Sequence, residues 1–203
     1  YGGLSLWAQG AIPAKAEILC VPRKAFISPT DSGWWQSMGS VFSDKEVLAI
    51  RLIEERRRGS ASMFADYLRI LPTAADLHSL PFYSENELEI LKGTYAMSLL
   101  HEYRQKLQGF AKRLHELSPD GFKRVMFDEL KWAVAIVDSR AFTTKKTKGA
   151  HELNERPFLA PVADMLNHNS QARVGWKLGE RGFCIHTLDR VAVNSEIFNH
   201  YND

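Results

Sequence analysis

The chain has 203 residues, of which 45% are hydrophobic and 25% are charged, and its formal net charge is +2. The apolar content and the 11 Phe, 6 Tyr and 5 Trp exclude a disordered chain, while the near balance of charge disfavours a strongly basic nucleic-acid-binding protein. The length predicts one domain, or one domain with a large insertion.

Extended segments open the chain. Residues 4–8 alternate between aliphatic and other side chains, and an apolar run over residues 17–21 ends at Pro22. Phe26 and Ile27 add a further short extended piece. Turn residues separate these segments, which favours β-strands.

From Ser43 the hydrophobic period becomes helical. Ser43 and Glu46 have the spacing of a capping box, and Gly59 ends the helix that follows. Ser84 and Glu87 repeat that spacing. Apolar residues spaced by three and four then predict a long amphipathic helix. The further helices are expected at residues 63–71, 84–91, 94–117 and 128–139, the last one capped by Asp128.

Three consecutive arginines, Arg56 to Arg58, end the first helix. We interpret them as a solvated last turn that complements the helix dipole. The alternative is a helical nucleic-acid-binding module, which the weak global charge disfavours.

After Phe142 the pattern returns to loops and short strands. Residues 143–149 are polar, and strand-like runs follow at 174–178, 182–188 and 197–201. Because strands flank a helical block of about a hundred residues, we expect that block to be an insertion into one β-rich domain. The predicted organisation is an α+β fold with parts 1–42, 43–142 and 143–203.

Two cysteines, Cys20 and Cys184, are too few for a disulfide framework or a Cys-rich zinc module. They can pair if the fold brings them together, but nothing in the sequence requires it. We expect no metal site. Since the chain lacks both a run of about 18 apolar residues and a signal-peptide pattern, we expect an intracellular, soluble protein, with cytoplasm, nucleus and plastid not distinguished.

The densest polar cluster is the segment Asp164 to Asn169. On local sequence it is typical of a turn with Asx capping. Asp164 and His168 are four residues apart, but no third metal ligand is evident nearby. Generic nucleophile, phosphate-loop and zinc-protease signatures do not occur in the chain.

Four segments, taken in order, resemble the SET-domain protein methyltransferases, in the branch similar to the plant Rubisco large-subunit lysine methyltransferase. They are residues 2–22, which contain Gly-Gly-Leu-Ser-Leu and end in Val-Pro, Ser139-Arg-Ala-Phe142, Asp164-Met-Leu-Asn-His168 and Glu196-Ile-Phe-Asn-His-Tyr201. The resemblance spans essentially the whole chain, and it implies a β-rich SET fold with a C-terminal pseudoknot and a helical insertion.

The resemblance also implies an activity. SET enzymes of this branch transfer a methyl group from S-adenosylmethionine to a neutral lysine amine of a non-histone protein. Accordingly, the expected partner is a lysine-containing protein segment, with neither nucleic acid nor membrane, and the oligomeric state stays open. The alternatives are a protein-histidine methyltransferase of the same branch and a SET scaffold with weak catalysis. Phe142 favours the lysine type.

Residue roles follow from the same resemblance. Tyr201 resembles the catalytic tyrosine beside the methyl-transfer channel. The residues expected to bind the cofactor are Gly3, Leu4, Arg140, Asn167 and His168. Those expected on the substrate side are Ser139, Asp164 and Trp176, with core packing as the alternative for Trp176.

Two departures from the family pattern stand out. The chain lacks a Cys-rich segment after the SET domain, so that zinc module cannot close the channel. The branch carries a helical C-terminal substrate-binding domain, whereas this sequence ends two residues after Tyr201. We therefore expect no complete domain of that kind within these 203 residues.

Overall fold

A computed structural model describes residues 4–31, 41–117, 125–143 and 156–201 of the chain. The chain divides into two compact units. Unit 1 comprises Tyr1–Ser28 and Arg140–Asp203, and unit 2 comprises Pro29–Ser139. Within the described residues, no helix is long and apolar enough to cross a membrane.

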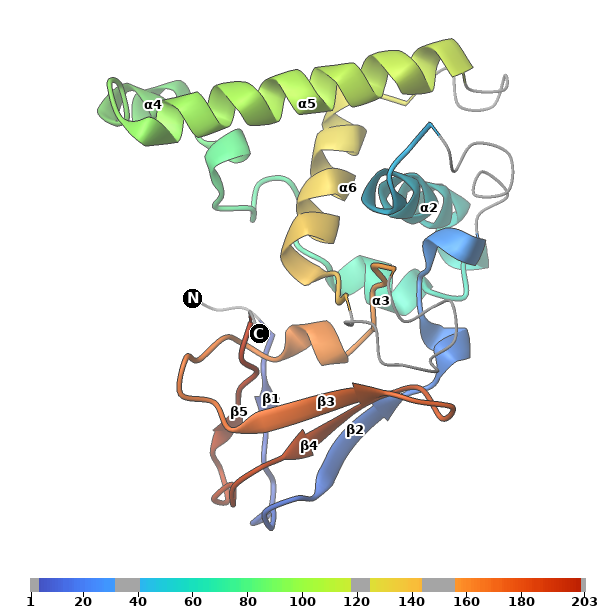
Figure 1. Ribbon diagram of the computed structural model, residues 1–203, viewed down its shortest axis with the longest axis vertical. Helices are drawn as coiled ribbons and strands as arrows, with labels where there is room; N and C mark the ends of the chain where they lie inside the picture. Colours follow the sequence, from blue (N-terminus) through green and yellow to red (C-terminus); the bar gives the residue numbers. More distant parts are fainter. Residues whose placement is uncertain (1–3, 32–40, 118–124, 144–155, 202–203) are drawn as a thin grey trace. The chain divides into compact units, whose positions relative to one another are not determined.

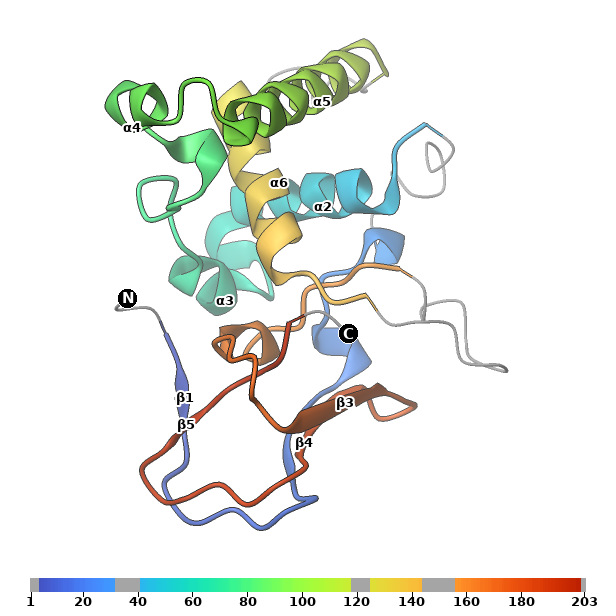
Figure 2. The same cartoon turned by 60° about the vertical axis from the view of Figure 1, so that its left-hand side comes forward.

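Unit 1 is built on two antiparallel sheets (Figure 1). In the larger one, β4 (Phe183–Thr187) lies between β2 (Glu17–Val21) and β3 (Val174–Leu178). The smaller sheet pairs β1 (Leu6–Trp7) with β5 (Glu196–Ile197), and the two segments run side by side in Figure 2. Both sheets thus join the beginning of the chain to its end, as the predicted insertion requires.

Aromatic side chains fill the core of unit 1. The rings of Phe26 and Phe158 stack with their centroids 4.6 Å apart, and Phe183 lies 5.5 Å from Phe158 in an edge arrangement. Isolated backbone bridges from Ile27 to Leu159 and from Phe142 to Phe158 join the segments that carry this cluster. Phe183 and Leu159 are fully buried, so the cluster excludes water from the centre of the unit.

The strand predicted at residues 197–201 is wrong in extent, because only Glu196–Ile197 belongs to β5. Beyond Ile197 the backbone changes partner: Asn199 forms a parallel bridge with His168 instead of continuing along β1. The end of the described chain is therefore fixed by the loop around residues 167–169.

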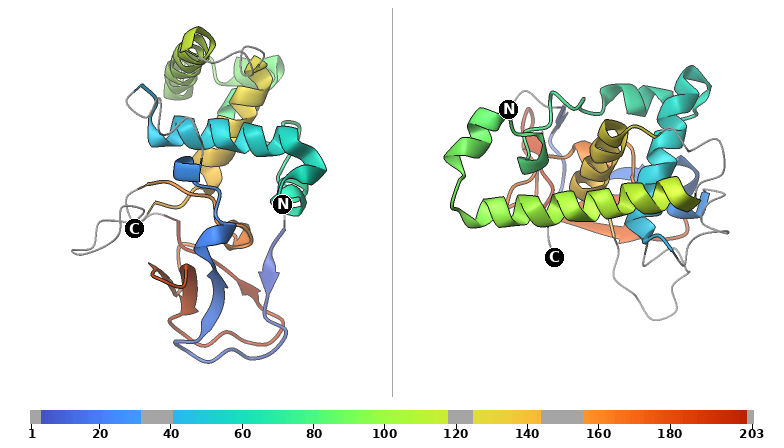
Figure 3. Two further views of the ribbon diagram at one scale, coloured as in Figure 1. Left: turned by 90° about the vertical axis from the view of Figure 1, so that its right-hand side faces the viewer. Right: turned by 90° about the horizontal axis from the view of Figure 1, so that it is seen from above.

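Unit 2 is helical (Figure 3). Its helices are α2 (Asp44–Arg58), α3 (Ala65–Ile70), α4 (Glu85–Ile90), α5 (Tyr95–Leu117) and α6 (Phe127–Arg140), whose last residue opens the second part of unit 1. Both predicted capping boxes are confirmed, since Ser43 and Ser84 each accept a hydrogen bond from the backbone three residues on. The predicted cap of the last helix is wrong: Asp128 lies inside α6. The carboxylate of Glu129 accepts the backbone N–H of Met126 there instead.

Helix α2 is the centre of the helical unit. Its inward residues are almost completely buried, namely Val47, Leu48, Ala49, Ile50, Leu52 and Ile53. Glu55 is also buried, and its carboxylate pairs with Arg51 and Arg58. Arg57 pairs with Glu129 of α6.

Each arginine of the run that ends α2 has a partner within unit 2. The guanidinium of Arg56 lies 4.1 Å from the ring centroid of Trp132, while Arg57 and Arg58 form ion pairs. Arg56 and Arg57 therefore join α2 to α6, whereas Arg58 pairs with Glu55 of its own helix.

The unit boundaries differ from the predicted part boundaries at residues 42 and 142. The compact units divide after Ser28 and before Arg140. A 3₁₀ turn at Pro29–Asp31 packs against α2, which assigns these residues to the helical unit.

Gly182 provides a test of the sheet. Its φ is +140°, and a Cβ built there would lie 1.9 Å from the carbonyl oxygen of Val21 on the facing strand. Gly182→Ala is therefore expected to lower the free energy of unfolding by about 2 kcal/mol or more. Urea denaturation measures this, and Gly179→Ala is the matched control because open space surrounds that position. Equal stability of the two variants would contradict the described pairing of β2 with β4.

Candidate functional site

The predicted polar cluster lies on a strained turn of unit 1. Val162 has φ 75° and ψ −41°, an unfavourable backbone conformation for a β-branched residue. A 3₁₀ turn over Ala163–Met165 follows at once. Such strain persists only where the surrounding structure enforces it, and it is concentrated at functional sites in proteins.

A buried ion pair anchors this turn. The guanidinium of Arg140 donates to the carbonyl oxygen of Asp164 (3.1 Å) and lies 3.2 Å from its carboxylate. The Asp164 side chain is 1% exposed, whereas that of Arg140 is 26% exposed. Arg140 thus compensates a buried negative charge and still presents part of its cation to solvent.

Two hydrogen bonds place Tyr201 beside the same turn. Its hydroxyl donates to the carbonyl oxygen of Leu166 (2.6 Å), and its backbone N–H donates to Nδ1 of His168 (3.0 Å). Because Nδ1 is the acceptor, the proton of the neutral imidazole lies on Nε2. The rings of His168 and Tyr201 lie 5.1 Å apart. Both ends of the tyrosine are therefore held by the segment 166–168.

Asn167 is oriented from the C-terminal side. Its Nδ2 donates to a carboxylate oxygen of Glu196 at 2.6 Å. The backbone carbonyl oxygen of Asn167 accepts the backbone N–H of Asn199 (2.8 Å), and the backbone carbonyl of Asn199 accepts the N–H of Asn169 (3.0 Å). Since the amide NH₂ is engaged, the exposed Asn167 side chain offers its oxygen as an acceptor.

The electrostatics of Tyr201 connect these groups. Partial burial raises its pKa above the ordinary value, the Asp164 carboxylate raises it further, and the Arg140 guanidinium lowers it. The net direction is upward, so the hydroxyl stays protonated and neutral throughout the physiological range. The site therefore combines a neutral phenol, a partly exposed cation and fixed carbonyl acceptors, which suits orienting a neutral nucleophile better than abstracting a proton.

The other predicted site residues lie as follows. Gly3 is outside the described residues, and Leu4 is an exposed residue two positions before β1. Ser139 donates its hydroxyl to the carbonyl of Ala135 within α6 (2.7 Å). Trp176 on β3 packs its ring against Phe142 and Phe183, with centroid distances of 5.9 and 5.4 Å. The structure thus gathers Arg140, Asp164, Asn167, His168 and Tyr201 in one place and puts Trp176 in the aromatic core.

Sequence reasoning assigned no role to three groups of this site. They are the Glu196 carboxylate that accepts from Asn167, the Leu166 carbonyl that accepts from the Tyr201 hydroxyl, and the side chain of Asn199. Asn199 is buried, and its Oδ1 has no hydrogen-bond partner in the described part of the chain. An acidic residue at the head of the last strand was a usable signal for Glu196. Backbone carbonyls leave no such signal in a sequence.

Known proteins share this architecture. No family model matches the chain. It is 28% identical over 177 residues to the ribulose-1,5 bisphosphate carboxylase/oxygenase large subunit N-methyltransferase of Nicotiana tabacum, covering 83% of this chain. It is 31% identical over 175 residues to the fructose-bisphosphate aldolase lysine N-methyltransferase of Arabidopsis thaliana, covering 82%. The crystal structure of the SET domain of LSMT bound to lysine and AdoHcy matches with a TM-score of 0.80 and 23% identity, over 98% of this chain and 47% of that one.

The fold is therefore that of a SET domain, which confirms the predicted α+β class with a helical insertion. The chain belongs to the SET-domain family, in the branch similar to the Rubisco large-subunit methyltransferase. It spans about a third of the length of those two relatives, 34% in each case.

The buried ion pair predicts a large effect of Arg140 on stability. Arg140→Met removes the cation beside a carboxylate that is 1% exposed, so we expect a loss of about 3 kcal/mol in the free energy of unfolding. The double variant Arg140→Met/Asp164→Asn should recover much of that loss, as urea denaturation would show.

Arg69→Met is the control, because Arg69 pairs with an Asp66 side chain that is 95% exposed and should contribute little. If Arg140→Met were as mild as this control, the described burial of Asp164 would be contradicted.

Proposed function

We propose that this chain is the catalytic SET domain of an S-adenosylmethionine-dependent protein-lysine N-methyltransferase acting on a non-histone protein. The observation that carries the proposal is the fixed position of Tyr201 on the Leu166 carbonyl, beside Asn167 and His168. In support, both relatives described above are named as N-methyltransferases, one of them for lysine, and the similar SET domain is bound to lysine and AdoHcy.

The donor set of the site fits the cofactor. The Asn167 side-chain oxygen, left as an acceptor by the bond to Glu196, suits an ammonium group. The exposed part of the Arg140 guanidinium suits a carboxylate. These two residues would hold the amino-acid end of S-adenosylmethionine. When bound, the cofactor supplies a methyl group on a sulfonium, ready for direct displacement by a neutral amine.

The residues of this chain would then orient the acceptor. A free lysine has a pKa of about 10.4, so its amine must lose a proton to solvent before it can react. The raised pKa of Tyr201 keeps its hydroxyl neutral, and its proton is already donated to Leu166. The hydroxyl oxygen therefore has lone pairs left to accept a hydrogen from the amine, which aligns the nitrogen lone pair.

The substrate class is the finer part of the proposal. The relatives are named for Rubisco and for aldolase, which favours a non-histone protein target here as well. Phe142 follows Arg140 by two residues and packs in the aromatic cluster, so it offers no polar group to an imidazole. That feature favours lysine over histidine as the methyl acceptor.

Tyr201→Phe tests the proposed role. Removing the hydroxyl should reduce methyl transfer on the order of 100-fold through lost orientation, with little change in cofactor affinity. The measurements are incorporation of labelled methyl groups into a mixed protein acceptor and calorimetric titration of S-adenosylmethionine. Amino-acid analysis of the product separates methyllysine from methylhistidine.

Tyr95→Phe is the matched control, because Tyr95 is 73% exposed in the helical unit. Cofactor binding by the wild-type chain without transfer to any acceptor would favour the scaffold alternative over the enzyme. Unchanged transfer in Tyr201→Phe would instead refute the role given to Tyr201 alone.

The pH dependence gives a second test. Below the lysine pKa the neutral amine fraction rises about tenfold per pH unit, so kcat/KM should climb steadily from pH 7 to about 9. Since the pKa of Tyr201 is raised, its ionisation should produce no fall in rate below about pH 10. A fall in kcat/KM that begins near pH 9 while the chain is still folded would contradict this expectation, provided that the fall is absent in Tyr201→Phe.

A further inference from the structure

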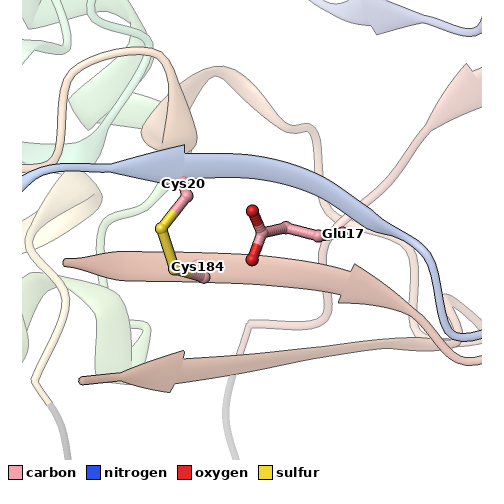
Figure 4. A group of neighbouring side chains, drawn as sticks. All are labelled: Glu17, Cys20 and Cys184. Carbon is pink, nitrogen blue, oxygen red and sulfur yellow. A yellow bond between two sulfur atoms is a disulfide. The ribbon is translucent and has the colours of Figure 1, made fainter. Parts of the chain in front are cut away.

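A second group of reactive side chains lies on the sheet of unit 1, outside the site described above. Cys20 on β2 faces Cys184 on β4, and the two form a disulfide with their Cα atoms 3.9 Å apart (Figure 4). Glu17 is paired with His186 further along the same ladder, and the Leu19–Ile185 pair and a register shift lie between it and the cysteines. Since alternate residues of a strand share a face, Cys184 and His186 project to the same side of β4.

The donor atoms are close together. One ligand atom each from Glu17, Cys20 and Cys184 lie within 4.8 Å of one another. His186 lies outside this group of three, and its Nε2 atom lies 3.5 Å from Oε2 of Glu17. Arg181 donates a further hydrogen bond to Glu17 from the solvent side. Two sulfurs, one imidazole nitrogen and one carboxylate are the donor types that zinc takes in proteins.

We propose that Cys20, Cys184, Glu17 and His186 form a redox-gated site for a soft divalent cation such as Zn²⁺. In the disulfide form both sulfurs are bonded to each other and the site is closed. A dithiol reductant opens it: the reductant loses two electrons and two protons and becomes a disulfide, while Cys20 and Cys184 become thiols. Binding of the cation then releases the two thiol protons to solvent.

The backbone permits this geometry. A zinc–sulfur bond of about 2.3 Å in a tetrahedral centre sets the two sulfurs about 3.7 Å apart. Cys20 and Cys184 lie directly opposite each other with their Cα atoms 3.9 Å apart, so after reduction rotation of the two side chains can bring the sulfurs to that separation.

The local charge also balances. Two thiolates and one carboxylate carry three negative charges against two on the cation, and the Arg181 guanidinium on Glu17 supplies the third positive charge. Cys184 is 8% exposed, while Glu17 and His186 have side chains 34% and 37% exposed, so the cation can enter from the Glu17 side. The site is independent of the proposed methyl transfer, because it uses none of its residues.

Cobalt substitution tests the proposal on the full chain. A phosphine reduces the disulfide to two thiols and is itself oxidised to the phosphine oxide by taking the oxygen of water. Co²⁺ should then bind the reduced chain one to one. Thiolate-to-cobalt charge-transfer bands and the visible bands of tetrahedral cobalt report the ligands. The disulfide form should show neither.

Variants assign the ligands. Cys20→Ser and Cys184→Ser should lose the charge-transfer bands of a two-thiolate site. Glu17→Gln and His186→Asn should keep those bands but weaken Co²⁺ binding by about 10-fold or more. His115→Asn, on the exposed surface of α5, is the control and should match the wild type.

Each contrary outcome overturns the proposal. A reduced chain that is folded by far-ultraviolet circular dichroism but shows no cobalt bands has no such site. A chain that unfolds on reduction also refutes it, because the ligands require the paired strands. Unchanged cobalt bands in both cysteine variants would place the metal elsewhere. Methyl-transfer activity enters none of these readouts.

Discussion

Pairing between the two ends of the chain is the constraint on which the rest of the structure depends. Strand β2 pairs with β4, so that Cys20 lies opposite Cys184, 164 residues further along the chain. Strand β1 pairs with β5 in the same way. The entropic cost of closing such a loop grows only slowly with its length, so a folded helical unit can occupy the interval at little extra cost. The insertion departs from unit 1 after Ser28 and returns at Arg140.

The candidate site follows from this closure. Once β5 is paired with β1, the next residues are directed along the segment that contains His168, and the Asn199 bridge fixes their register. That register brings the hydroxyl of Tyr201 to the Leu166 carbonyl and its backbone to His168. Two hydrogen bonds thus orient the tyrosine before any ligand binds. Catalysis by positioning the reactants requires such preorganisation. The strained Val162 lies on the same segment.

Local sequence signals predicted local structure well. The capping boxes at Ser43 and Ser84 place helix starts because their hydrogen bonds span only three residues, and the apolar spacing of α5 identified a helix whose observed start is Tyr95. Tertiary choices were not predictable in this way. Strand β5 ends early because the backbone at Asn199 pairs with His168 instead of with β1. The hydrogen bond from Asn167 to Glu196 joins residues 29 apart in the sequence. The resemblance to a family supplied Tyr201 and Asn167, but not the carboxylate that orients the amide.

The alternation of strand β4 places the aromatic core and the cysteine pair on opposite faces of one sheet. Phe183 and Ile185 are fully buried and face the aromatic core. That core includes Phe142, which bridges to Phe158 and follows Arg140 by two residues. Cys184 and His186 project to the opposite side. A change of bonding at the sulfurs therefore acts on the face of the sheet opposite to Phe183 and Ile185. Because the cysteine pair joins β2 to β4, a coupling between it and the tyrosine site would act through the pairing of these two strands.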